Sequence, residues 1–372
     1  MTRLAIVRQK YRPDGGAERF VASALKALSK QKHLDVTVIT RKWQGEINPG
    51  FQVKICNPLK FGRVSREKRF ASAAQQHFSD FDIVQSHERI PGCTIFRAGD
   101  GVHKCWLKHR SRILSDSEAL RLQSDPFHKY VMGAEKSMFE HSELKAVICI
   151  SEMIKREILQ EFDINENKLH VIYNSVDNAR FHPNLRQTYR QPVRKKFGIS
   201  EDEPCLIFVG SGFERKGLAQ AIKSVARAGV SLLVVGKDKN QKHYQQLAEQ
   251  LGCSDKVHFA GVQEQPEHFY AAADGFILPT LYEPFGNVVL EAMASGLGVI
   301  TTETCGGADI IQPDKNGYIC DALDVEALTH SINCFFQNEK PLSLGLEARK
   351  TANLYTAELL SSKLQSLYEN CL

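Results

Sequence analysis

Several signals that would place a chain in a membrane or in a secretory route are missing from this sequence of 372 residues. It contains no uninterrupted apolar stretch of about 18 residues, the length that a membrane-spanning helix requires. Its first apolar segment, residues 4–7, is too short for the core of a secretory signal. We therefore expect a cytoplasmic protein without a transmembrane span.

Patterns typical of metal sites and disulfide frameworks are missing as well. The ten cysteines stand singly between Cys56 and Cys371, without a C-x-x-C pair, and several, such as Cys149 and Cys205, lie in apolar segments. This distribution is typical of reduced core residues. No H-E-x-x-H motif and no suitably placed D-x-D motif occurs. The sequence therefore predicts no metal site and no cofactor.

Charge is divided unevenly along the chain. Residues 1–115 contain 22 Lys and Arg against 9 Asp and Glu, although the whole chain has a formal charge of only +5. Possible partners of this basic part are an anionic membrane surface, a phosphorylated acceptor or nucleic acid. Nucleic acid is not expected, because no recognised binding motif accompanies the charge.

One basic cluster is mixed with apolar residues, as in a helix that lies on a membrane surface. It consists of Lys60, Arg63, Arg66, Lys68 and Arg69, beside Leu59, Phe61 and Phe70. A basic face that is merely solvated accounts for the same pattern equally well.

The length and the alternation of short apolar strands with helical patterns predict two α/β domains with parallel sheets. The first domain is expected over residues 1–180 and the second over 201–354, joined by a polar linker at 181–200. Apolar residues at helical spacing predict a last helix over 355–372.

A stretch in the second half, 279–296, brings two carboxylates close to a helix start. Glu283 precedes the turn Pro284–Gly286, and Glu291 lies one to two turns into the helix that begins near Asn287. The free N–H groups of such a helix end attract phosphate, and carboxylates beside it can accept hydrogen bonds from sugar hydroxyls. Either glutamate alone would more often be a solvated surface residue.

Two adjacent cations, Arg215 and Lys216, follow the strand predicted over 205–209 in a glycine-rich loop. A diphosphate leaving group needs such cations if no metal neutralises it. The alternative is an ordinary solvated turn between strand and helix.

The first half has two loops of interest at the ends of predicted strands. Gly15 and Gly16 permit a tight turn with a close backbone approach to a ligand, although an ordinary strand-to-helix turn also uses such a pair. The Gly-Asp-Gly loop after residues 94–97 displays Asp100 and His103 at the edge of a sheet where α/β domains bind ligands. A lone histidine is nevertheless more often a packed or surface residue.

The segment from Glu283 to Gly296 resembles the E-x7-E signature of retaining glycosyltransferases of the GT-B fold, family 4; its sequence is E-P-F-G-N-V-V-L-E-A-M-A-S-G. The loop 210–217 and the segment 172–177 also resemble family segments, with Ser211 and Ser175 in place of the usual arginine and glycine. The resemblance implies two Rossmann-like domains facing a central cleft, with the last helix crossing back to the first domain.

The resemblance also implies a role for each site residue. Glu283 would hold the hydroxyls of the donor sugar, Glu291 those of the ribose, and His103 and Asp100 would steady the sugar from the other domain. The backbone at Val262 would pack near uracil, and Gly15 and Gly16 would lie over the cleft. The diphosphate would be bound by Arg215, Lys216 and the helix start at Phe285, Gly286, Asn287 and Val288. The departing phosphate oxygen can itself accept the acceptor's proton in this class.

The opening residues 10–20, the loop 210–217 and V-V-G-K-D at 234–238 look most like bacterial lipopolysaccharide inner-core transferases. This resemblance implies metal-independent retaining transfer of a hexose or hexuronic acid, glucose or galacturonate, from a UDP-sugar to a heptose, by an enzyme on the inner face of the bacterial inner membrane. Alternatives are a different glycan or lipid acceptor, a GT-B nucleotide-sugar epimerase, or a membrane- or glycan-binding protein without turnover.

Overall fold

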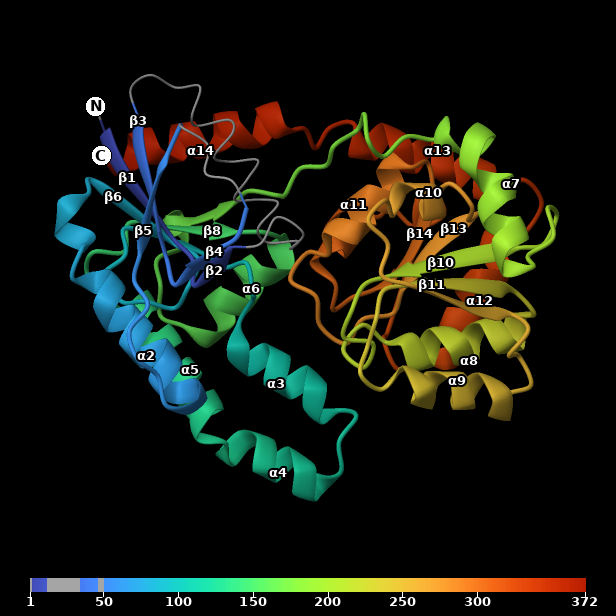
Figure 1. The fold of residues 1–372 in the computed structure, drawn as a ribbon, viewed down its shortest axis with the longest axis horizontal. Helices are drawn as coiled ribbons and strands as arrows, with labels where there is room; N and C mark the ends of the chain where they lie inside the picture. Colours follow the sequence, from blue (N-terminus) through green and yellow to red (C-terminus); the bar gives the residue numbers. More distant parts are fainter. Residues whose placement is uncertain (1, 12–33, 46–49) are drawn as a thin grey trace. The chain divides into compact units, whose positions relative to one another are not determined.

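The computed structural model describes residues 2–11, 34–45 and 50–372, which form two compact units (Figure 1). The first unit consists of the described residues up to Asn174 and the C-terminal segment Ala357–Leu372. The second unit is continuous, from Ser175 to Thr356. Each unit has its own parallel sheet and its own buried core.

Seven parallel strands form the main sheet of the first unit, in the order β5-β3-β1-β6-β7-β8-β9. They are β1 (Thr2–Val7), β3 (Leu34–Thr40), β5 (Gln52–Ile55), β6 (Ile83–Ser86), β7 (Ile95–Arg97), β8 (Ala146–Cys149) and β9 (Leu169–Val171). Leu4–Val7 is fully buried, as expected for a parallel strand covered on both faces. A short parallel pair, β2 (Lys10–Tyr11) and β4 (Lys42–Trp43), stacks Tyr11 on Trp43 at 4.0 Å between ring centroids.

Helices of the first unit cover the sheet and also extend from it. They are α2 (Gly62–Gln75), α3 (His103–Ser111), α4 (Asp116–Ser124), α5 (Pro126–Phe139), α6 (Glu152–Glu161) and α14 (Ala357–Cys371), with 3-10 turns at Phe78–Asp80 and Glu166–Lys168. Figure 1 shows α2 beside α5, and α3 and α4 reaching away from the sheet. Asp125 separates α4 from α5 and caps the latter, because its carboxylate accepts a hydrogen bond from Phe127 N at 2.7 Å.

The C-terminal helix α14 belongs to the core of the first unit. Its apolar side chains Leu360, Leu364 and Leu367 pack with buried residues of β1, β3, β6 and β8. Tyr368 Oη donates a 2.7 Å hydrogen bond to Gln85 Oε1 on β6. The chain therefore returns to the first unit after it has completed the second.

Six parallel strands form the sheet of the second unit, in the order β12-β11-β10-β13-β14-β15. They are β10 (Cys205–Val209), β11 (Ser231–Val235), β12 (Val257–Gly261), β13 (Gly275–Leu278), β14 (Gly298–Thr302) and β15 (Gly317–Cys320). Strands β10, β11, β13 and β14 are buried along their whole length, because helices cover both faces of the sheet (Figure 1).

Two groups of helices cover this sheet. Helices α8 (Leu218–Ala228), α9 (Gln241–Gln250) and α12 (Val325–Phe335) lie together, as do α7 (Leu185–Phe197), α10 (Glu267–Tyr270), α11 (Asn287–Ala294) and α13 (Lys340–Ala352), and a 3-10 helix spans Gly306–Ile310. The linker expected over residues 181–200 is wrong, because most of it is α7, which packs on α10 inside the second unit. Its polar composition reflects three arginines that are needed for packing.

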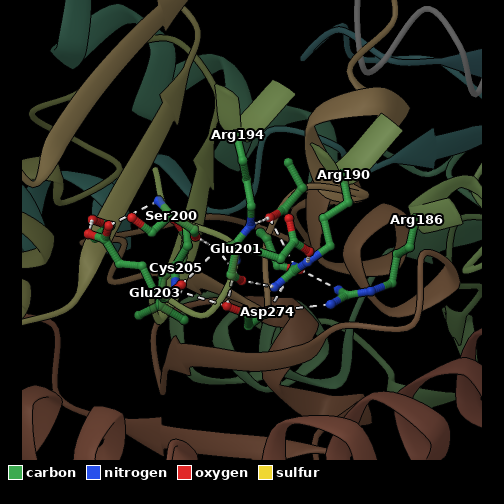
Figure 2. Close-up of polar contacts among 12 residues, drawn as sticks. Arg186, Arg190, Arg194, Ser200, Glu201, Glu203, Cys205 and Asp274 are labelled. Atoms are coloured by element: carbon green, nitrogen blue, oxygen red, sulfur yellow. Dashed lines mark hydrogen bonds and ion pairs between the residues drawn. The ribbon is translucent and has the colours of Figure 1, made fainter. Parts of the chain in front are cut away.

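These three arginines, Arg186, Arg190 and Arg194, surround Asp274, the residue before β13 (Figure 2). Arg194 is 1% exposed and donates to Asp274 Oδ2 at 2.8 Å, while Asp274 Oδ2 also accepts from Cys205 N at 3.0 Å. The guanidinium groups additionally donate to backbone carbonyls, among them Ala272 O and Ala273 O. The carboxylate therefore joins α7 to the starts of β10 and β13.

We expect Asp274→Ala to destabilise the second unit by about 3–5 kcal/mol, because it leaves buried guanidinium charge without a counter-ion. Differential scanning calorimetry of the full chain should show a lower unfolding temperature. The matched control is Glu201→Ala, which removes a 56% exposed partner of Arg190 and should cost less than about 1 kcal/mol. Equal effects of the two substitutions would contradict this account.

Candidate active site

In each sheet the early strands follow one another on one side of the first strand, and the later strands lie on its other side. The strand order therefore reverses beside the first strand. In the first unit the reversal lies between β1 and β6, and in the second unit between β10 and β13. In open α/β sheets, ligands bind outside the carboxyl ends of the strands at such a switch point. The loops after these four strands are therefore the first places to look for a site.

In the second unit, hydrogen bonds join the loop after β10 to the loop after β13. Arg215 O accepts from Leu281 N at 2.8 Å and from Thr280 Oγ1 at 3.0 Å. Gly217 lies at the closest approach: its φ is +76°, and a Cβ placed there would lie 1.8 Å from Pro279 O. Only glycine fits this backbone contact.

A third loop, after β14, fixes the position of Glu283. Glu283 N donates to Thr304 O at 3.0 Å, and Gly306 N donates to Glu283 O at 2.8 Å. The hydroxyls of Thr302 and Thr304 both donate to Thr280 O at 2.8 Å. The backbone of Glu283 is therefore held on both sides before its side chain makes any contact.

The Glu283 carboxylate is shared by the two adjacent cations that the sequence singled out. Oε2 accepts a 2.8 Å hydrogen bond from Arg215 Nη1 and another from Lys216 Nζ. Arg215 Nη1 also donates to Tyr282 O at 2.9 Å. Burial alone would raise the pKa of Glu283, but Lys216 and Arg215 outweigh it and hold that pKa at about 2. We call these three residues the ion triad.

The ion triad leaves donors available on both cations. Lys216 carries three N–H donors and Arg215 five, so one carboxylate oxygen cannot saturate them. The shared carboxylate fixes both side chains in place. The arrangement can therefore present preorganised positive charge to an anionic ligand.

The second glutamate of the motif has a different partner. Glu291 is 4% exposed on α11, and its Oε2 accepts a 3.1 Å hydrogen bond from Tyr270 Oη. Glu291 is thus bonded to a residue of α10, whereas Glu283 is bonded to the loop after β10. The helix start itself is as predicted: Gly286, with φ of +82°, precedes α11, and Asn287 and Val288 are its first two residues.

Two further predicted donor-binding positions differ in their exposure. Phe285 is buried under the loop, and its carbonyl accepts from Cys305 Sγ at 3.4 Å. Val262, which follows β12, is exposed. Gly15 and Gly16 lie outside the described residues.

The first unit has a pocket of ≈ 330 Å³ at the carboxyl ends of β1 and β6. Its lining includes polar and charged residues from four segments, namely Arg8, Lys10, Arg66, Glu67, Glu88, Arg89, Asp100 and His103. Phe70, Ile90 and Val131 add an apolar wall. The structure thus brings the predicted Asp100 and His103 together in one pocket.

His103 is the first residue of α3, and its ring is held by a neighbour. Nε2 lies 3.0 Å from His128 Nδ1, and the His103 backbone N–H donates to Glu135 Oε2 at 3.1 Å. Burial, together with the nearby charge of Arg89, lowers the pKa of His103 to about 3. His103 is therefore a neutral hydrogen-bonding group near pH 7. Asp100 Oδ2 lies 3.8 Å from Arg8 Nη1.

Sequence reasoning missed three residues that shape this pocket. Glu135, buried on α5, accepts from Arg89 Nε at 2.7 Å, and Arg89 Nη2 donates to Gly101 O at 2.9 Å. Glu88 accepts from Gln9 N at 2.9 Å, and burial raises its pKa to about 7. No local motif marks them, because their roles depend on contacts between segments that are far apart in sequence.

Residues 2–11, 34–45 and 50–372 contain neither a cluster of metal-ligating side chains nor a helix suited to cross a membrane. In this part of the chain, His, Cys, Asp and Glu side chains nowhere gather in threes in a way that could hold a metal ion. None of its helices combines the length and the apolar character that crossing a membrane requires.

Two α/β units, each with a parallel sheet and a polar site at its switch point, have the architecture of the GT-B fold. Family models agree: residues 14–180 match "Glycosyltransferase Family 4" and residues 190–351 match "Glycosyl transferases group 1". The chain therefore belongs to the family 4 glycosyltransferases with the GT-B fold.

Individual relatives refine this assignment. The chain is 28% identical over 330 residues to the lipopolysaccharide glucosyltransferase WaaG of Escherichia coli K12, which spans 85% of this chain and 84% of WaaG. It is 36% identical over 140 residues to the lipopolysaccharide core biosynthesis glycosyltransferase LpsE of Rhizobium meliloti, across 37% of this chain and 41% of LpsE. The chain is thus a glycosyltransferase related to lipopolysaccharide core glucosyltransferases.

Solved structures share the fold. The crystal structure of WaaG superimposes with a TM-score of 0.82 at 24% identity, covering 98% of this chain and 99% of WaaG. Anabaena HepE in complex with UDP and glucose superimposes with a TM-score of 0.72 at 17% identity over the full length of both chains.

The ion triad should make the second unit more stable at neutral than at acidic pH. The pKa of Glu283 is depressed from 4.5 to about 2, so its contribution is complete above about pH 5 and is lost as the pH falls toward 2. This shift corresponds to about 3 kcal/mol. The stability difference between the wild type and Glu283→Gln, measured by chemical denaturation, should shrink over this range. Glu249→Gln, at an exposed position of α9, is the control, and a difference independent of pH would refute the prediction.

Proposed function

We propose that the protein transfers glucose or galacturonate from a UDP-sugar to a heptose of the lipopolysaccharide inner core, with retention of anomeric configuration. The ion triad at the switch point of the second unit is the observation that carries this proposal, because it suits a diphosphate leaving group. The similarity to WaaG and LpsE supports the acceptor class. A UDP-linked donor agrees with the UDP found in HepE.

Departure of the nucleotide diphosphate concentrates negative charge on its terminal oxygens. Arg215 and Lys216 would bind these oxygens with their remaining N–H donors, and the start of α11, at residues 285–288, would add backbone N–H groups. Transfer would then need no metal ion. The departing phosphate oxygen is the group that we expect to accept the proton of the acceptor hydroxyl.

The remaining predicted residues would orient the donor. Glu283, with its second oxygen and its fixed backbone, would accept hydrogen bonds from the sugar hydroxyls. Glu291 would bind the ribose hydroxyls after exchanging its bond to Tyr270, and the exposed Val262 would lie against the base. Neutral His103 and the carboxylate of Asp100 would steady the sugar from the first unit.

The lipid-linked acceptor would bring the enzyme to the cytoplasmic face of an anionic membrane. Support for this part of the proposal is an exposed patch before and within α2, in which Leu59 is 77% and Phe61 75% exposed. Lys60 lies between them, and the Arg69 guanidinium lies 5.4 Å from the centroid of the Phe61 ring. Apolar side chains beside cations favour insertion into a negatively charged surface.

Lys216→Ala should reduce kcat/KM for transfer by about 10²- to 10³-fold, the usual effect of removing one group that stabilises a transition-state oxyanion. Release of UDP from UDP-glucose and UDP-galacturonate is measured with and without purified core glycolipid. Lys223→Ala, at an exposed position of α8, is the matched control and should leave the rate unchanged. An unchanged rate in Lys216→Ala would remove the diphosphate role, and interconversion of free UDP-sugars would identify an epimerase instead.

The double substitution Leu59→Ser and Phe61→Ser should weaken binding to vesicles of phosphatidylglycerol and phosphatidylcholine at least about tenfold, because two inserted apolar side chains are lost. Sedimentation with vesicles measures the partition. Leu342→Ser removes a similarly exposed leucine of the second unit and serves as the control. If the double variant partitions like the wild type, this patch does not bind membranes.

A further inference from the structure

Arg41, at the end of β3, is a buried cation with few partners. Only 6% of the residue is exposed, and Nη2 donates a 2.9 Å hydrogen bond to Asn57 Oδ1. Among the described residues, its Nε and Nη1 have no hydrogen-bond partner although both atoms are buried. Buried donors without acceptors are destabilising, and guanidinium donors especially so. Donors of this kind need an acceptor that a bound water molecule or a ligand can supply.

Besides hydrogen-bond acceptors, Arg41 also lacks, within the described part of the chain, a negative charge of its own to balance its guanidinium. Its electrostatic neighbours are Arg66 and Glu67 on α2. Arg66 already pairs with Glu67 at 2.8 Å, and Glu67 also accepts a hydrogen bond from Gln9 Nε2. Burial, and next the proximity of Arg66, lower the pKa of Arg41. Glu67, the negative group near Arg41, is therefore already paired with Arg66.

This arginine pair adjoins the pocket of the first unit. Arg41 N donates to Gln9 O at 3.0 Å, and Gln9, Arg66 and Glu67 all line the pocket. Lys10 adds positive charge at the same end of the sheet. Arg8 and Arg89, by contrast, have carboxylates as counter-ions: Arg8 Nη1 lies 3.6 Å from Glu88 and 3.8 Å from Asp100, and Arg89 pairs with the buried Glu135. The excess of positive charge therefore lies on the side of the pocket formed by the ends of β1 and β3 and by α2.

We propose that Arg41 and Arg66 form a binding site for a phosphoryl group, and that this group is carried by the acceptor. The planar fork of a guanidinium matches two phosphate oxygens, and a dianion would satisfy both the unbonded donors of Arg41 and the unbalanced charge of the pair. The assignment to the acceptor rests on the proposed function. The phosphate site itself rests only on residues of the first unit.

The substitution Arg41→Met preserves the length of the side chain and removes its charge. Its effect on the melting temperature distinguishes a ligand-binding arginine from a structural one. Without ligand, the variant of the full chain should melt at the same temperature as the wild type or higher, because a strained buried charge is gone. Inorganic phosphate, compared with chloride at equal ionic strength, should raise the melting temperature of the wild type and not that of the variant. Arg66→Gln, at a less buried position, should also lose the phosphate response. Arg3→Met, at the opposite end of the same sheet, should keep it.

A lower melting temperature of Arg41→Met combined with a normal phosphate response in Arg66→Gln would overturn the proposal and make Arg41 a structural residue. If Arg41→Met does not fold, the response of Arg66→Gln decides alone. A wrong proposed function gives a different result: the wild type would then show no transfer, and inorganic phosphate would still raise its melting temperature.

Kinetics with two acceptor preparations identify the source of the phosphate. With phosphorylated core glycolipid, KM should rise about 10- to 100-fold in Arg41→Met and Arg66→Gln, the effect of losing charge-assisted hydrogen bonds, with little change in kcat. With enzymatically dephosphorylated glycolipid, the variants and the wild type should have the same KM. Equal use of both preparations by the wild type would mean that free phosphate is the ligand. If the two variants lose only their binding to phosphatidylglycerol vesicles, the ligand is the phosphate of a lipid headgroup. Each of these last two results would overturn the assignment of the phosphate to the acceptor.

Discussion

The structure of the second unit's site depends on one carboxylate that two adjacent cations share. Without Glu283, Arg215 and Lys216 would repel each other at the end of a buried strand, and their side chains would lose the carboxylate that fixes them in place. The backbone of Glu283 is in turn held by the loop after β14. The packing of three loops therefore holds the two cations in position before any ligand binds. Such preorganised charge is what stabilises a developing negative charge during a reaction.

Sheet topology explains why polar chemistry gathers at these places. Strand order reverses beside β1 and beside β10, so the loops that follow these strands diverge from those after β6 and β13 and leave room for ligands. In the first unit the space is a pocket with mixed charge, and in the second it is occupied by the ion triad. The same construction thus yields two sites with different chemistry on one chain.

Local patterns predicted much of this arrangement. Continuous apolar runs indicated the buried strands, and the motif around Glu283 predicted both the loop and the start of α11. The linker at 181–200 was wrong because polar composition cannot distinguish solvated arginines from arginines that surround a buried Asp274. Glu135 and Arg41 were missed for the same reason: their partners are distant in sequence, and burial of a charge is a property of the assembled fold.

If the ion triad is the diphosphate site, a crystal of the full chain soaked with UDP should show the β-phosphate within about 3 Å of Lys216 Nζ and of the Arg215 guanidinium, near the start of α11. A diphosphate bound elsewhere, with Glu283, Arg215 and Lys216 unchanged and without contact to it, would contradict the claim.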